Sequence, residues 1–216
     1  MIQKHGSPIN NFTSEKGWLV WGYDPLNIRP RDCLGAGSMY DDLFERYTGG
    51  CLEDVNAEEP GPIRARINAT GCHVLRHQQP NLTINNNAWQ PGGYNGGPAV
   101  VFVSGDMTIG EDIFIRPETG IIFVVGGDIN TEESVENIAG MFIFDGSFDD
   151  MSGDEKLVIR GALVGGFNDE SFGFRRDLGA DNENDPAEHI IYEPKYLWLF
   201  RDIVGDKNTI LKEVAP

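Results

Sequence analysis

The chain has 216 residues, of which 40% are hydrophobic and 24% are charged, and its formal net charge at pH 7 is -17. This length is enough for one sizeable core. A charge so negative repels phosphate backbones, which argues against nucleic acid and anionic membrane surfaces as partners and favours a solvated acidic surface or cation binding. The 27 glycines favour turn-rich β structure.

The first part of the chain, residues 1–60, is rich in proline, glycine and asparagine and shows no regular hydrophobic period. Because the repeats that follow it predict a solenoid, whose open end needs a cover, we interpret this segment as an irregular N-terminal cap or a linker. Trp18, Trp21 and Tyr23 in "GWLVWGY" are a candidate carbohydrate-binding platform. The alternative is that these aromatic side chains pack inside the core or the cap.

Three cysteines, Cys33, Cys51 and Cys72, leave at least one thiol without a partner inside the chain. A disulfide between Cys33 and Cys51 would suit a loop-rich segment in an oxidising compartment. The alternative is three buried thiols.

A seven-residue pattern recurs in the region from residue 61 onward. Val101–Met107 returns as Phe123–Ile129, and Phe142–Phe148 and Leu157–Leu163 fit the same pattern. Successive glycines of the pattern are 22, 19 and 15 residues apart. Such short repeats predict the coils of a solenoid, whereas the strands of a β-sandwich, the alternative, have no reason to share a glycine position. The predicted fold is all-β, a right-handed parallel β-helix over residues 61–216.

The repeat places Asp106 and Asp128 at equivalent positions, directly after the glycine. Stacked carboxylates on an exposed sheet face are the groups that a solenoid enzyme would use to cleave polysaccharides. The alternative is that each aspartate is a turn residue beside a glycine. No nucleophile motif, P-loop or zinc-protease motif occurs, so the prediction leans away from an enzyme.

Two acidic segments are candidate calcium sites, because alternating oxygen ligands on a tight loop suit Ca²⁺. The stronger candidate consists of Asp181, Glu183 and Asp185, and the weaker one of Asp149, Asp150 and Asp154. The alternative for both segments is a solvated acidic loop. Arg175 and Arg176 could pair with Asp177 or with the first loop instead, which would stitch the C-terminal closing segment to the solenoid. Calcium is the one cofactor that the sequence suggests.

The C-terminal half carries an ordered series of motifs: "GDMTIGEDIFIRPETGIIFVVGGDIN", "GMFIFDGSF", "LVIRGALVGGF", "FRRDLGADNENDPAEHIIYEPKYLWL" and a terminal "EVAP". Over residues 98–216 this series resembles the C-terminal region of large uncharacterised proteins of candidate phyla radiation bacteria. Those proteins look secreted or surface-exposed. The resemblance implies a β-solenoid, extracellular display and no catalytic residues to carry over.

The predicted function is that of a non-enzymatic, extracellular structural or adhesive module at the cell surface. One alternative is a filament-forming subunit, and another is a carbohydrate-active β-helix, either a lyase or a hydrolase. The expected partners are further copies of the chain, other surface proteins or a polysaccharide. No apolar run approaches the ~18 residues that a membrane helix needs. The N-terminus lacks the apolar core of a signal peptide, so the chain is expected to be either cytosolic or a mature or excised piece of a longer protein. The resemblance favours the excised piece.

Overall fold

The computed structural model describes residues 38–47, 50–90, 92–165, 172–179 and 185–196. The chain divides into two compact units, Met1–Ser38 and Met39–Pro216. The first unit lies almost wholly outside the described residues, and the described helices and strands belong to the second. Within the described residues, neither helix has the length and apolarity that a membrane crossing needs.

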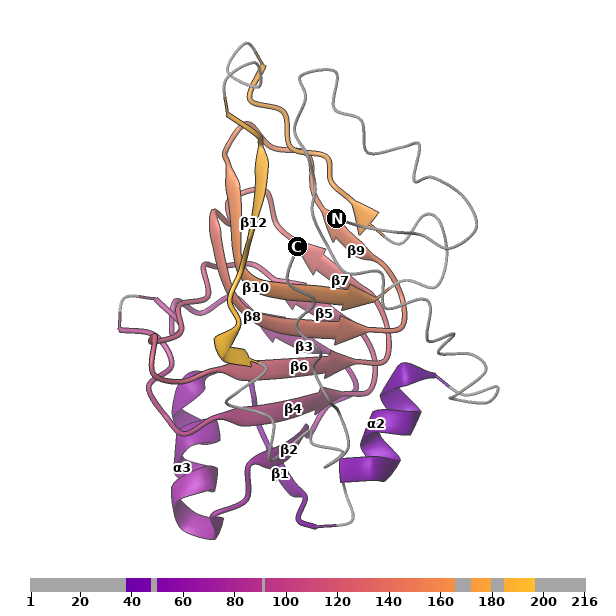
Figure 1. The fold of residues 1–216 in the computed structure, drawn as a ribbon, viewed down its shortest axis with the longest axis vertical. Helices are drawn as coiled ribbons and strands as arrows, with labels where there is room; N and C mark the ends of the chain where they lie inside the picture. The colour runs from indigo at the N-terminus through magenta and orange to yellow at the C-terminus, as the bar shows by residue number, and fades with distance from the viewer. Residues whose placement is uncertain (1–37, 48–49, 91, 166–171, 180–184, 197–216) are drawn as a thin grey trace, which may run out of the picture. The chain divides into compact units, whose positions relative to one another are not determined.

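Two parallel β-sheets form the body of this unit (Figure 1). The seven-stranded sheet contains, in spatial order, β1 (Glu53–Val55), β2 (Val74–His77), β4 (Ala99–Val103), β6 (Ile121–Val125), β8 (Asn137–Phe144), β10 (Leu157–Gly165) and β12 (Glu188–Tyr192). The five-stranded sheet contains β11 (Phe172–Gly173), β9 (Phe148–Asp150), β7 (Ile129–Thr131), β5 (Met107–Ile109) and β3 (Leu82–Ile84). The chain alternates between the sheets and advances one strand per turn, which confirms an all-β parallel β-helix.

The strands of the seven-stranded sheet bury both of their faces. Val101 of β4 pairs in register with Phe123 of β6, which pairs with Phe142 of β8, and all three side chains belong to the main core inside the solenoid. The neighbouring Phe102 and Val124 point outward into a second apolar cluster. Two buried faces explain why these strands are continuous apolar runs rather than alternating sequences.

Helix α2 (Met39–Tyr47) covers part of the outer face of this sheet. The ring of Phe102 lies edge-on to the rings of Tyr40 and Phe44, at centroid distances of 5.7 and 5.2 Å. The backbone amide of Met39 donates to Asp145 Oδ1 over 2.6 Å, so a carboxylate between β8 and β9 accepts at the helix N-terminus. The N-terminal segment therefore contributes a helix that packs on the outer face of the sheet.

The repeated glycines lie where the chain leaves the seven-stranded sheet for the five-stranded one. A Cβ atom on Gly127 would collide with the side-chain oxygen of Asp106 from the preceding turn. Gly105 and Gly146 stand in the same relation to Asn81 and Asp128. The glycine recurs because the polar side chain and the backbone of one turn occupy the space where the next turn would carry a Cβ.

The prediction that Leu157–Leu163 is a fourth copy in register with the other three is wrong. Gly161 pairs with Gly140 and not with Gly146, so it does not lie at the same corner. Gly140 and Gly161 have φ angles of +145° and +146°, and a Cβ on Gly161 would collide with the carbonyl oxygen of Gly140. Gly140 and Gly161 are paired with each other inside β8 and β10 and do not lie at a corner. Apolar residues flank them on both sides, so their sequence looks like that of a corner glycine.

Helix α3 (Pro60–Thr70) forms the N-terminal cap, and Ile63 and Ile67 insert into the main core. The helix begins with a proline and ends at Gly71, whose left-handed conformation (φ +68°) stops it. The boundary expected at residue 61 falls inside this helix, and β1, which precedes the helix in the chain, pairs in parallel with β2.

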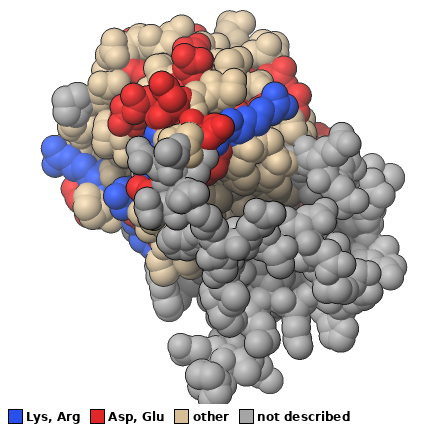
Figure 2. Space-filling view, turned by 90° about the horizontal axis from the view of Figure 1, so that it is seen from above, with Lys and Arg blue, Asp and Glu red and all other residues tan. Residues whose placement is uncertain are grey.

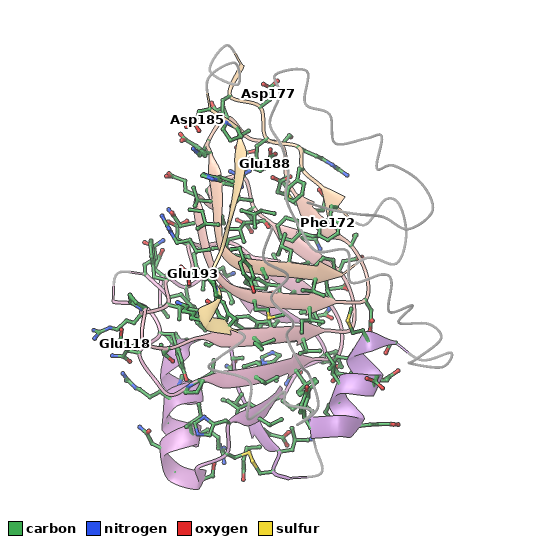
Figure 3. The ribbon with its side chains drawn as sticks, in the orientation of Figure 1. Glu118, Phe172, Asp177, Asp185, Glu188 and Glu193 are labelled. Carbon is green, nitrogen blue, oxygen red and sulfur yellow. A yellow bond between two sulfur atoms is a disulfide. The ribbon has the colours of Figure 1, made fainter. Side chains whose placement is uncertain are left out.

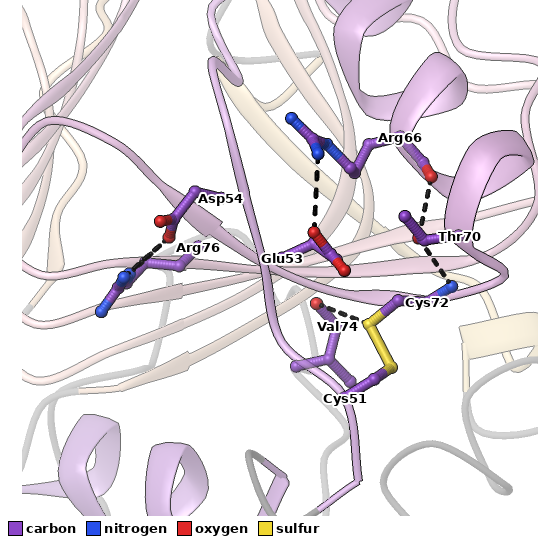
Figure 4. A network of polar contacts seen from close by, with 8 residues as sticks. All are labelled: Cys51, Glu53, Asp54, Arg66, Thr70, Cys72, Val74 and Arg76. Carbon is purple, nitrogen blue, oxygen red and sulfur yellow. Dashed lines mark hydrogen bonds and ion pairs between the residues drawn. A yellow bond between two sulfur atoms is a disulfide. The ribbon is translucent and has the colours of Figure 1, made fainter.

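The disulfide joins Cys51 to Cys72 (Figure 4). The predicted bridge between Cys33 and Cys51 is wrong, because Cys51 is already bonded; Cys33 lies outside the described residues. The register of β1 and β2 explains the pairing, since Glu53 opposite Leu75 places Cys51 beside the start of β2. The Cα atoms of the two cysteines are 5.8 Å apart, and the bridge closes the loop that contains the cap helix.

Candidate functional site

The carboxylates of Asp106 and Asp128, the predicted catalytic candidates, serve the corner between the sheets. Asp106 Oδ1 accepts the backbone amide of Asp128 over 2.9 Å. Asp128 Oδ1 accepts the amide and the hydroxyl of Ser147 over 2.6 and 2.9 Å. The side chain of Asn81 begins the same series by accepting the amide of Asp106 over 3.0 Å. We call Asn81, Asp106, Asp128 and Ser147 the corner ladder.

Other aspartates repeat this arrangement at different positions. Asp112 Oδ1 accepts the amides of Glu136 and Asn137 over 2.8 and 2.9 Å. Asp150 Oδ1 accepts the amide of Arg175 over 2.6 Å. A charged acceptor strengthens such a bond, so these carboxylates fasten each turn of the solenoid to the next one. The turn interpretation of Asp106 and Asp128 is the one that agrees with their contacts.

A buried group of charges lies toward the C-terminal end of the solenoid. The side chains of Asp150 and Arg176 are fully buried, and Arg176 Nε lies 3.8 Å from Asp150 Oδ2. The guanidinium also donates to the backbone carbonyls of Glu132, Glu133 and Glu155 over 2.8 to 3.2 Å. The amide of Arg176 donates to Glu188 Oε1 over 2.7 Å. We call Asp150, Arg176 and Glu188 the buried charge cluster.

Burial shapes the acidity of the two carboxyl groups in this cluster. The pKa of Glu188 is raised to about 6, chiefly by loss of hydration; the Arg176 amide lowers it, and the nearby Asp150 carboxyl raises it. Burial likewise raises the pKa of Asp150, although the Arg175 amide and the Arg176 charge oppose the shift. With one cation beside a buried carboxyl and a half-buried one, the cluster favours holding a proton.

The described calcium candidates do not form the acidic loops that the sequence suggests. Asp149 and Asp150 do not lie in a loop but in strand β9, where they face opposite sides, and Asp149 pairs with Arg175 at 2.9 Å. Asp154 is exposed in the segment that follows. Asp185 receives both of its contacts from Lys156 Nζ, at 2.6 and 2.7 Å.

Asp181 and Glu183, and also Trp18, Trp21 and Tyr23, lie outside the described residues. Among the residues that are described, no three acidic, histidine or cysteine side chains are grouped closely enough to hold a metal ion. The prediction paired Arg175 or Arg176 with Asp177 or the acidic loop, most of which lies outside the described residues. In the described part of the chain the two arginines contact Asp149 and Asp150, because β11 runs beside β9.

Charged side chains are unevenly distributed on the described surface. Figure 2 looks onto the end of the solenoid that is uppermost in Figure 1, where acidic side chains gather in a cluster beside separate basic ones. Asp177, Asp185 and Glu188 come from this end, whereas Glu118 projects on the side along which α3 runs (Figure 3). The two regions offer a ligand different charge environments.

Two adjoining cavities lie on the side of the solenoid that carries Glu118. One, of about 300 Å³, is lined chiefly by polar side chains, including Arg64, Gln90, Asn95 and Arg116. The other, of about 330 Å³, is lined by the apolar side chains of Phe114, Ile115 and Pro117. Gly92, Gly93 and Arg116 line both cavities. We call the pair the arginine groove.

Sequence reasoning missed the arginine groove. Its two arginines are far apart in the sequence and share no motif, and the sequence signal nearest to it is the glycine-rich "PGGYNGG" between the first rungs. That stretch predicts a turn. The arginines that line the groove beside it come from α3 and from the segment after β5, which the sequence does not connect with it.

Comparisons with protein-family models, with curated proteins and with solved structures found no significant match to this chain. The resemblance to surface proteins of candidate phyla radiation bacteria therefore stays a prediction, and any function proposed for the chain rests on the geometry of the solenoid itself.

Proposed function

We propose that this chain is a non-enzymatic β-solenoid module that serves as a structural or adhesive unit at a cell surface. The observation that carries the proposal is the corner ladder. The stacked carboxylates that a polysaccharide-cleaving solenoid would need, Asp106 and Asp128, are each engaged by the backbone amide of the following turn. A general acid or base must reach the substrate proton, and the Oδ1 atom of each of these carboxylates is directed at the protein's own backbone.

The extracellular part of the proposal is supported by the disulfide between Cys51 and Cys72. Disulfides form and persist mainly in oxidising compartments such as the cell exterior. A stack of parallel strands, fastened from turn to turn by carboxylates and closed by a cystine, suits a rigid spacer or display element.

The proposal is tested by incubating the purified chain with polygalacturonate, alginate, hyaluronan and a neutral glucan. Release of reducing ends and of unsaturated uronates is measured against a heat-denatured sample. We expect no product from the native chain. The matched variants Asp106→Asn and Asp128→Asn keep an acceptor oxygen for the ladder and should melt at nearly the same temperature. Product that appears with the native chain and disappears in either variant, at unchanged Tm, would overturn the proposal.

Self-association is a second candidate, and one observation favours it. β12 is the last strand of the seven-stranded sheet within the described residues, and it carries exposed Ile190 and Tyr192 side chains. An end strand with apolar side chains is a template for pairing with another chain. Negative-stain electron microscopy over a concentration series tests this, with Ile190→Lys as the comparison. Filaments that the substitution abolishes would support assembly, and single particles at every concentration would contradict it.

A further inference from the structure

The arginine groove has walls that the solenoid ladder holds in place. Tyr94 and Ile115 form a parallel bridge. The amide of Tyr94 donates to the carbonyl of Phe114 over 2.8 Å, and the amide of Arg116 donates to the carbonyl of Tyr94 over 3.1 Å. The Tyr94 ring is fully buried and stacks near Trp89, so the backbone on this side is anchored from inside the core. The groove is therefore a fixed feature of the fold.

Gly93 determines how closely the two walls approach. A Cβ atom at this position would collide with the carbonyl group of Phe114, and the φ angle of +49° is one that most side chains avoid. The glycine keeps the floor of the groove open and places no side chain between the polar cavity and the apolar one. A ligand that spans both cavities would cross the backbone at this point.

The groove is lined by positive charges, whereas the chain as a whole is strongly negative. Arg64 and Arg116 line the same cavity, although the chain carries a formal net charge of -17. Arg64 Nη1 donates to Asn95 Oδ1 over 2.7 Å, which fixes its direction. The carboxylates near the groove are Glu118, at 4.0 Å from Arg116 Nη1, and Glu59, which accepts a hydrogen bond from Asn86. At 4.0 Å Glu118 leaves most donors of Arg116 unengaged by it.

We propose that the arginine groove binds a carboxylate-bearing saccharide, with the acid group in the polar cavity and a sugar face against Phe114. Guanidinium groups form paired hydrogen bonds with carboxylates. The amides of Gln90 and Asn95 offer partners for hydroxyl groups. The Phe114 side chain, 39% exposed, provides a flat apolar surface of the kind that a sugar ring covers. Cavities of this size hold small ligands that combine one apolar wall with a few placed polar groups.

This inference rests on the adhesive form of the proposed function and supplies its ligand class. It is tested by titrating the whole chain with trigalacturonate in a calorimeter at low salt. We expect saturable binding that weakens as salt is added, and no binding of the neutral galactose trimer. Arg116→Gln should weaken binding about tenfold or more, since it removes a charged hydrogen-bond donor. Phe114→Ala should weaken the binding of trigalacturonate while leaving any binding of inorganic phosphate unchanged.

Arg76→Gln is the matched control, because it removes the same charge from an exposed arginine that pairs with Asp54 and lines neither cavity. It should leave the affinity within about twofold of the native chain. The inference is overturned if trigalacturonate fails to bind, if Arg76→Gln lowers the affinity as much as Arg116→Gln, or if phosphate binds as tightly as the saccharide. Cleavage of trigalacturonate during the titration would instead overturn the non-enzymatic proposal, so the two failures are distinguishable. Thermal melts of each variant establish that it is folded.

Discussion

At its N-terminal end the solenoid is closed by apolar side chains of α3 and by the disulfide, whereas toward its C-terminal end a buried arginine and two carboxyl groups lie among the last turns. One row of inward-facing side chains in the five-stranded sheet changes from apolar to polar between the two ends. Ile84 pairs with Ile109, which pairs with Thr131, which pairs with Asp150, and all four side chains are buried.

The difference between the ends has a physical consequence. The N-terminal end depends chiefly on packing and on the oxidation state of two sulfurs. It also buries the titratable side chain of His77, whose pKa is lowered by burial, so protonation at acidic pH should destabilise this end. The polar end depends on a guanidinium and on shared protons, so its stability should respond to pH and to the loss of one partner. Substitutions at each end should separate the two, and the largest effect is expected at the polar end.

Arg176→Ala should destabilise the chain most. It removes the cation from a buried site and leaves Asp150 and three backbone carbonyls without the guanidinium. Breaking a buried ion pair in this way costs about 3–5 kcal/mol. Urea unfolding at neutral pH measures the change. The neighbouring Arg175→Ala removes a largely exposed ion pair to Asp149 and should cost about 1 kcal/mol or less. Equal losses in the two variants would show that the buried charge cluster does not stabilise this end.

The double variant Cys51→Ala/Cys72→Ala should lower the free energy of unfolding by about 3 kcal/mol, as expected for a loop closed over a separation of 21 residues. Reduction of the native chain should lower its free energy of unfolding by a similar amount, so that the reduced native chain and the double variant are equally stable. Thiol titration of the unfolded, oxidised chain checks the pairing: one free thiol per chain is expected, from the third cysteine. Three free thiols in protein from an oxidising compartment would contradict the bridge.

Gly127→Ala should cost about 1–3 kcal/mol, because the new methyl group would displace the Asp106 side chain from the corner ladder. In a double-mutant cycle with Asp106→Ala the two losses should add only in part, since the collision with the carboxylate disappears while the tight approach to the Gly105 backbone remains. Thermal or urea unfolding of the four proteins gives the coupling energy. Fully additive losses would mean that the glycine recurs for a reason other than the side chain of the preceding turn.

The solenoid was predictable because its signal is local and repeated. The apolar run of Val101–Val103 and the glycine at 105 return one turn later, and each copy meets the same neighbours. The cap helix was not predictable in the same way. Ile63 and Ile67 point into the core over a single helical turn, and no repeat marks that segment as different from the rungs that follow.

The sites depend on contacts that join different turns. Arg176 reaches carbonyl groups 21 to 44 residues earlier in the chain, and no sequence spacing announces those partners. Cys51 finds Cys72 through the register of β1 and β2, which the sequence does not specify for such short strands. The corner aspartates were identified from the repeat, but only the direction of their oxygen atoms distinguishes a ladder from a catalytic pair.

Glu188→Gln should produce the smallest effect and the most specific one. Because the pKa of Glu188 is raised from 4.5 to about 6 in the folded chain, the folded state binds the proton more tightly than the unfolded state does. The stability that this group contributes is therefore present below about pH 4.5 and is lost as the pH rises through about 6. Glutamine imitates the protonated acid and keeps the oxygen that accepts the Arg176 amide.

The variant should match the native chain in unfolding free energy near pH 4.5 and exceed it by about 1 kcal/mol at pH 7, after allowance for the partial exposure of the carboxyl group. Glu118→Gln is the matched control, because it neutralises an exposed carboxylate on another side of the solenoid (Figure 3). If Glu118→Gln stabilises the chain at pH 7 as much as Glu188→Gln does, relief of general charge repulsion explains the gain. If only Glu188→Gln does so, the proton belongs to the buried charge cluster, and the two ends of the solenoid respond to different conditions.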